Sequence, residues 1–132
     1  MARIVHLSEA VTIGIHSMVL IARAGGIINV NIIAEQTGAS RNHLAKVMQR
    51  LVKAGFLKSN RGPAGGFVLK KNPKEITILQ IYEAIEGKIE IDGCPMNQQI
   101  CPFDKCLIGG IVKDVSKEFI KYIKKTTLND YL

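Results

Sequence analysis

The stretch QTGASRNHLAKVMQRLVKAGFLKSNRGPAGGFVLKKNPK, residues 36–74, decides the fold, and its charge sets it apart from the rest of the chain. It contains no aspartate or glutamate, although it holds nine of the eighteen lysines and arginines of the 132-residue chain. A one-sign block of this length creates a local field that suits a polyanion. Apolar residues recur through it at regular spacings, so it is not a disordered basic tail. We therefore interpret it as a folded surface for nucleic acid.

The first part of this block predicts a helix from Ser40, a favoured N-cap residue, to about Ala54, before Gly55. Four apolar residues at helical spacing would face the core: Leu44, Val47, Met48 and Leu51. The remaining face carries hydrogen-bond donors and no acids: Arg41, Asn42, His43, Lys46, Gln49, Arg50 and Lys53. A core-facing stripe is expected of any helix, so it is the acid-free outer face that favours contact with DNA.

The flanking segments predict a winged helix. A short helix from Val30 to Thr37 with Gly38 in the turn completes a helix-turn-helix. Two strands, residues 56–60 and 67–70, flank the glycine-rich turn 61–66. This turn lacks the Gly-Lys-Ser/Thr ending of a nucleotide-binding loop and lies between strands, which argues against a nucleotide enzyme.

The remaining helices follow from local signals. Ser8 should cap a first helix with Glu9 in its first turn, and Gly25-Gly26 should end it. A capping box at Thr77 opens a helix that Gly87 closes. Asp104 should cap a last long helix to about Lys125. Its apolar seam would pair two subunits, with docking inside one chain as the alternative: Ile108, Ile111, Val112, Val115, Phe119, Tyr122 and Ile123.

The expected fold is mainly α with a small β wing: a winged helix-turn-helix plus a long C-terminal dimerisation helix. We expect a DNA-binding domain at residues 1–87, a cysteine-bearing loop at 88–103, and the dimerisation helix and tail at 104–132. Aromatic residues make up 5% of the chain and tryptophan is absent, which disfavours single-strand binding by base stacking. The net charge is +7 and no apolar run is long enough to span a bilayer, so we expect a cytoplasmic protein without membrane contact.

All three cysteines lie in one short segment: Cys94, Cys101 and Cys106. Structural zinc usually requires closely spaced pairs, which are absent here. Iron–sulfur clusters accept irregularly spaced thiolates on loops, and a helix start at Cys106 would favour its thiolate. The residues alone leave a cluster, ordinary or redox-active thiols and structural zinc open.

The order of these motifs resembles that of the Rrf-two family of bacterial transcription regulators. The most specific pieces are residues 42–47, the wing at 61–69, the stretch Asp104-Lys105-Cys106-Leu107 and the ending at 127–132. The resemblance covers nearly the whole chain. It implies a homodimer that binds double-stranded operator DNA and whose iron–sulfur cluster changes the affinity for DNA.

The resemblance implies cluster ligands at Cys94, Cys101 and Cys106, and a four-iron cluster rather than a two-iron one. IscR-like members carry a ligand histidine three residues beyond the last cysteine, where this chain has Gly109. NsrR-like members use, as the fourth cluster ligand, a carboxylate near the N-terminus of the partner subunit. Glu9 lies at the corresponding position in this chain. His6 and His16 are rivals for that fourth position.

The sequence therefore predicts a regulator, with repressor action among its roles, that senses redox state, nitric oxide or iron–sulfur supply. Arg41, Asn42 and His43 are expected at base edges in the major groove, and Arg61 in the minor groove. Phosphate contacts are expected from Lys46, Arg50, Lys58 and Lys70. The alternatives are a cluster-free thiol regulator on the same fold and a small electron carrier. An enzyme is disfavoured, because no nucleophile, base and orienting group can be recognised together.

Overall fold

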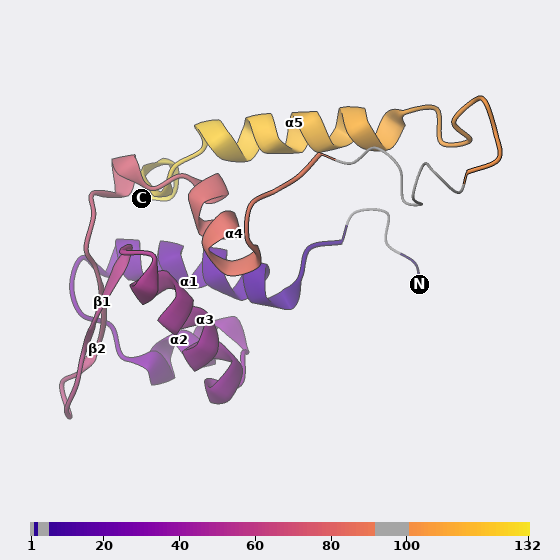
Figure 1. The fold of residues 1–132 in the computed structure, drawn as a ribbon. Helices are drawn as coiled ribbons and strands as arrows, with labels where there is room; N and C mark the ends of the chain where they lie inside the picture. The colour runs from indigo at the N-terminus through magenta and orange to yellow at the C-terminus, as the bar shows by residue number, and fades with distance from the viewer. Residues whose placement is uncertain (1, 3–5, 92–100) are drawn as a thin grey trace.

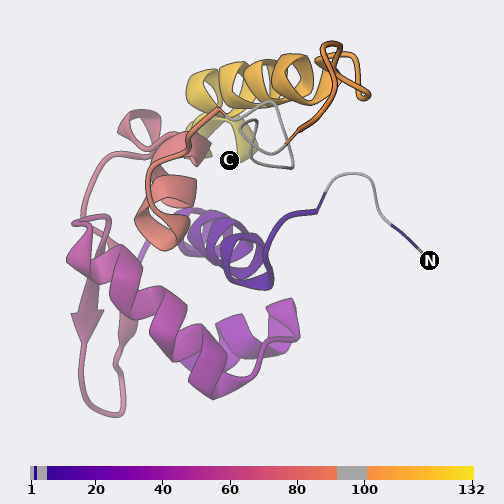
Figure 2. The same cartoon turned by 45° about the vertical axis from the view of Figure 1, so that its right-hand side comes forward.

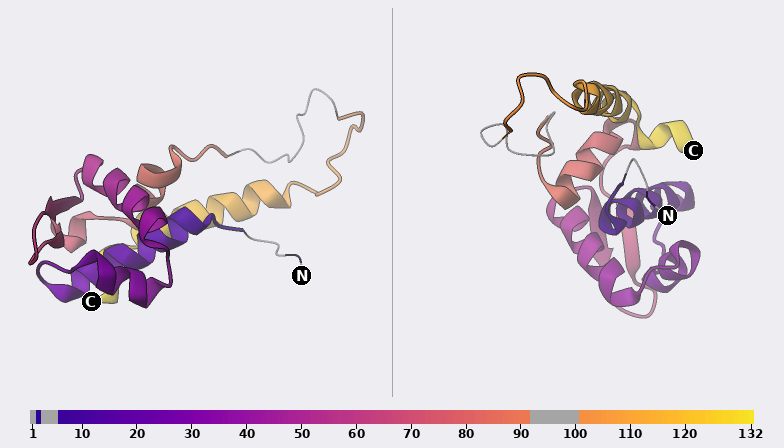
Figure 3. Two further views of the ribbon diagram at one scale, coloured as in Figure 1. Left: turned by 90° about the horizontal axis from the view of Figure 1, so that it is seen from below. Right: turned by 90° about the vertical axis from the view of Figure 1, so that its right-hand side faces the viewer.

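The computed structural model describes residue 2, residues 6–91 and residues 101–132. Helix α1 (Glu9–Ala24) lies at the centre, with the helix-turn-helix and wing on one side of it. Helix α4 (Ile78–Glu86) lies on the other side and carries α5 (Ile111–Lys125) (Figure 1). The recognition elements and α5 thus occupy opposite ends of the molecule, as the turned views also show (Figures 2 and 3). In the part of the chain that is described, no helix is long and apolar enough to cross a membrane.

The helix-turn-helix has the predicted bounds. Helix α2 (Val30–Thr37) ends at Gly38, whose φ of 73° is the left-handed geometry that favours glycine. Helix α3 (Arg41–Lys53) begins after Ser40, whose hydroxyl oxygen accepts a hydrogen bond from the His43 amide at 3.2 Å. The four predicted apolar residues of α3 are buried among side chains of α1 and α4. This packing fixes which face of α3 remains outside.

The wing is an antiparallel hairpin of β1 (Leu57–Asn60) and β2 (Gly66–Leu69). Phe67 exchanges backbone hydrogen bonds with Ile28 at 3.0 and 2.9 Å, so the α1–α2 loop adds one residue of a third strand. A Cβ on Gly66 would overlap with the carbonyl of Ile28. Glycine at this position therefore lets the wing lie directly against the helix-turn-helix.

Close packing also places α1 between α3 and α4. A Cβ on Gly14 would overlap with Cδ1 of Ile85 and would lie 3.4 Å from Val47. The C-terminal tail returns to the start of α4, where Leu128 is fully buried and donates its amide to the Ile76 carbonyl at 3.0 Å. Both hydrogen bonds of the predicted capping box are present: the Thr77 amide donates to the Gln80 side chain, and the Gln80 amide donates to the Thr77 hydroxyl. These contacts join the tail and α4 to the DNA-binding half.

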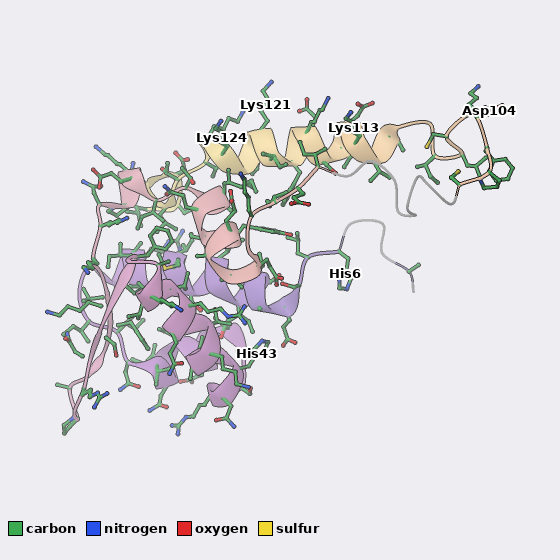
Figure 4. The ribbon with its side chains drawn as sticks, viewed as in Figure 1. His6, His43, Asp104, Lys113, Lys121 and Lys124 are labelled. Atoms are coloured by element: carbon green, nitrogen blue, oxygen red, sulfur yellow. The ribbon has the colours of Figure 1, made fainter. Side chains whose placement is uncertain are left out.

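The predicted start of the last helix is wrong. Asp104 lies in the loop before α5, well away from the helix start (Figure 4), and α5 begins at Ile111 after Gly110. Gly109 and Gly110 have φ values of 70° and 74°, which interrupt a right-handed helix. Cys106 therefore lies in a turn and not in the first turn of a helix, so the helix-dipole argument for its thiolate does not hold.

Helix α5 presents three kinds of surface. Ile123 is buried, and Phe119 packs edge-on against Tyr82 of α4 with ring centroids 6.1 Å apart. Val115 and Tyr122 of the predicted seam remain 48% and 54% exposed. Charged side chains, Lys121 and Lys124 among them, occupy the side away from the body (Figure 4). The helix thus contacts its own chain with one apolar edge and leaves a second edge uncovered.

Candidate nucleic-acid interface and cysteine loop

The outer face of α3 begins with residues predicted to contact bases. Arg41 and Asn42 are exposed, and His43 is half-buried, with 34% of its side chain exposed. Ser40 caps α3, so these three residues form its first turn. The first residues of a recognition helix are the ones that contact base edges in the major groove. The base contacts themselves stay a prediction.

The predicted phosphate-binding residues fall into two groups. Lys46, Lys58, Lys70 and the wing residue Arg61 are exposed, so their charges are available to a polyanion. Arg50 differs, because its Nη1 donates a hydrogen bond to the Ile85 carbonyl at 2.5 Å. This bond joins α3 to the end of α4. The Arg50 side chain therefore has a structural contact inside the chain beside any contact with phosphate.

The structure adds neighbours to Gln49 and Lys53, which the sequence had already placed on the outer face of α3. A shallow groove between α3 and the wing is lined by Ala45, Gln49, Val52, Lys53, Ser59, Phe67 and Val30. Ala45 and Gln49 lie one helical turn apart on the side of α3 that faces this groove. Helical periodicity could have grouped those two, but Ser59 comes from β1, so only the tertiary fold reveals it. Gln49 and Ser59 place polar groups between α3 and the wing, the two elements that are predicted to contact DNA.

The described end of the cysteine loop presents two thiols. Cys101 is half-buried and Cys106 is exposed. Backbone hydrogen bonds from Gly110 and then Ile108 and Gly109 lower the pKa of Cys106. Exposed thiolate character suits either metal ligation or redox chemistry. Cys94 lies outside the described residues, so the predicted three-cysteine site is not tested.

Of the candidates for a fourth ligand, Glu9 and His6 lie at the start of α1 and His16 lies midway along it. Glu9 is 76% exposed, and its Oε1 lies 3.9 Å from Nδ1 of His43. His6 is exposed on the segment that precedes α1. Nδ1 of His16 contacts the Thr12 carbonyl at 2.7 Å within α1. Among the described residues no three His, Cys, Asp or Glu side chains gather into a metal site.

Comparison with known proteins decides the family. A family model described as "Rrf2: Iron-dependent Transcriptional regulator" matches residues 7–132. The chain belongs to the Rrf2 family. The expected family and the winged-helix fold are thereby confirmed, and the relatives are transcriptional regulators and not enzymes.

Individual relatives differ in what they are named for. The HTH-type transcriptional regulator IscR of Pectobacterium atrosepticum is 30% identical over 98 residues, which is 74% of this chain and 60% of that protein. The structure of T. potens IscR is 26% identical, with a TM-score of 0.74 over 96% of this chain and 85% of that one. The structure of CymR, the global cysteine regulator of B. subtilis, is 27% identical, with a TM-score of 0.73 over 96% and 95%. Both kinds of regulator thus share this fold.

Proposed function

We propose that the chain is a homodimeric DNA-binding transcription regulator that senses redox state, nitric oxide or iron–sulfur supply through an iron–sulfur cluster. The observation that carries the DNA-binding part is the acid-free face of α3 beside a basic wing, both held on one rigid core. Family membership supports the regulatory role. The wing and α3 would contact the same duplex, since the Ile28–Phe67 bridge ties the hairpin to the helix-turn-helix.

The contacts divide by chemistry. Arg41, Asn42 and His43 would read base edges, while Lys46 and Lys58 neutralise phosphates. Phosphate contacts release counterions, so binding should weaken as salt rises. The wing residue Arg61 would enter the minor groove, where negative potential attracts arginine. Affinity would come from the basic residues and sequence preference from the start of α3.

The dimer would form through the uncovered edge of α5. Ile111, Val112, Val115 and Tyr122 are 54%, 36%, 48% and 54% exposed in the single chain. Apolar side chains in a continuous row on one helix are typical of a subunit interface. Pairing α5 with the α5 of a second copy would leave the charged side outside. Two copies would then present two α3 helices to two half-sites of an operator.

The cluster would be held by Cys94, Cys101 and Cys106, with Glu9 of the partner subunit as fourth ligand. The chemistry of the donors fits, because thiolates are the usual ligands and the pKa of Cys106 is lowered. When bound, such a cluster supplies an iron that reacts with oxygen or nitric oxide. We favour a four-iron over a two-iron cluster. This chain's residues would position it and link it, through α1, to α3.

Anaerobic purification with absorbance spectra and iron and sulfide counts tests the cluster. Cys101→Ala should lose it, while Glu9→Ala should keep a three-cysteine cluster with altered spectrum and lability. Operator binding by the iron-loaded and iron-free protein should then differ about 5- to 150-fold, which corresponds to a coupling of about 1–3 kcal/mol. Protein that binds no iron under these conditions would rule out the cluster.

A second candidate is a cluster-free thiol regulator. It is favoured by the exposed Cys106 with its lowered pKa, and by the likeness to a structure titled as the global cysteine regulator of B. subtilis. In that case peroxide or a disulfide reagent would change DNA affinity in protein that contains no iron, and a thiol reductant would restore it. Such a response in iron-free protein separates the two candidates.

A further inference from the structure

One electrostatic contact joins the start of α1 to the start of α3. Oε1 of Glu9 lies 3.9 Å from Nδ1 of His43, and this is the one contact within 4 Å between an acidic and a basic side chain among the residues that the structure describes. The distance is longer than a direct hydrogen bond, so the contact is Coulombic or bridged by one water. Figure 4 shows His43 at the end of α3 nearest to the start of α1.

The backbones of Glu9 and His43 are both fixed at capped helix ends. Glu9 is the first residue of α1, directly after Ser8, which caps α1 and whose hydroxyl donates to the Glu86 carboxylate at the end of α4. The His43 amide donates to Ser40, and Leu44 anchors the same turn in the core. The two side chains therefore meet between fixed helix ends. They do not meet by chance at the tips of mobile loops.

The negative charge of Glu9 is unexpected beside the first turn of α3. Residues 36–74 contain no acid, yet the fold brings this carboxylate to the first turn of α3. An acid beside a DNA-binding surface repels phosphates and weakens binding to every sequence alike. The carboxylate also lies on the Nδ1 side of the His43 ring, so Nε2 lies on the opposite side, away from Glu9.

We propose that Glu9 is a positioning residue for sequence recognition: its carboxylate orients the His43 ring so that Nε2 meets one base edge. The proposal rests on the proposed DNA-binding function and deepens it. Glu9 then lowers affinity for all DNA through its charge and raises the preference for one base through His43. These two effects have different dependence on sequence, so they can be measured separately.

A double-mutant cycle tests the pairing. Wild type, Glu9→Gln, His43→Ala and the double variant are compared on an operator and on single-base variants of it. An exposed charge pair contributes about 0.2–1 kcal/mol, so Glu9→Gln should lower the preference at one base position by a factor of about 1.4 to 5. In the His43→Ala background the same change should have no effect on that preference. Both backgrounds should gain similar affinity for non-specific DNA.

Glu35→Gln is the matched control, because it removes the same charge from an exposed residue of α2. It should raise affinity for all sequences without changing base preference. The proposal is overturned if Glu9→Gln behaves like Glu35→Gln. It is also overturned if the loss of preference persists without His43, as an effect through a bound cluster would. Wild-type protein without base preference at any position would refute the DNA-reading function itself, a result distinct from either of these.

Discussion

Adding a single methyl group at Gly66 should detach the wing from the helix-turn-helix. The new Cβ would overlap with the carbonyl of Ile28, which is backbone and cannot rotate away. Relief requires β2 to move off the α1–α2 loop, and that breaks the two Ile28–Phe67 hydrogen bonds. Each contributes about 0.5–1.5 kcal/mol net, so Gly66→Ala should lower the free energy of unfolding by about 1–3 kcal/mol.

Urea denaturation measures this loss, with an unchanged slope showing that the unfolding transition remains comparable. Gly26→Ala is the control, because a Cβ there meets no atom within 4 Å. Both variants restrict the unfolded chain equally, so their difference reports the clash together with the strain of a side chain at the Gly66 φ of 155°. DNA affinity should fall for Gly66→Ala alone, since the wing no longer holds its place beside α3. Equal stability and equal DNA affinity in the two variants would refute this account of the wing.

Four further predictions concern the dimer, the DNA contacts and the cysteine loop. Val115→Lys should dissociate the dimer in sedimentation at micromolar concentration, because an unpaired charge would be buried at a cost of several kcal/mol; Asp114→Lys, one residue away in α5, should stay dimeric. Lys46→Ala should weaken binding to all sequences and reduce the salt slope by about one unit. Arg61→Ala should weaken operator binding, and unchanged affinity would remove the wing from the interface. The pKa of Cys106 is lowered in the folded protein, so its thiolate should form at lower pH there than in urea-unfolded protein. The rate of Cys106 alkylation should therefore begin to rise at a lower pH in the folded protein. Coincident pH profiles of alkylation would contradict this.

The helices of the DNA-binding half could be predicted because their signals are local. Ser8, Ser40 and Thr77 cap their helices through hydrogen bonds to residues three positions ahead. Gly38 ends α2 for an equally local reason, its left-handed backbone. The acid-free outer face of α3 also followed from sequence, because four apolar residues at helical spacing determine which side is buried.

The errors and omissions have physical causes of two kinds. Asp104 was a reasonable cap by residue type, but the consecutive left-handed glycines at 109 and 110 delay the helix to Ile111. The Arg50–Ile85 and Glu9–His43 contacts join residues distant in sequence, so no local pattern contains them. The predicted DNA contacts stay predictions. So do the predicted cluster ligands, since Cys94 lies outside the described residues.

Selection of bound duplexes from a random DNA pool tests the central claim most directly. A dimer that places two α3 helices on one duplex should enrich an inverted repeat whose half-sites are about one helical turn, or a multiple of it, apart. Selection with His43→Ala should relax preference at a defined position in each half-site, while Lys46→Ala should return the same sequence with lower affinity. Enrichment of no sequence, by either the iron-loaded or the iron-free wild-type protein, would contradict the assignment of α3 and the wing as a sequence-reading surface.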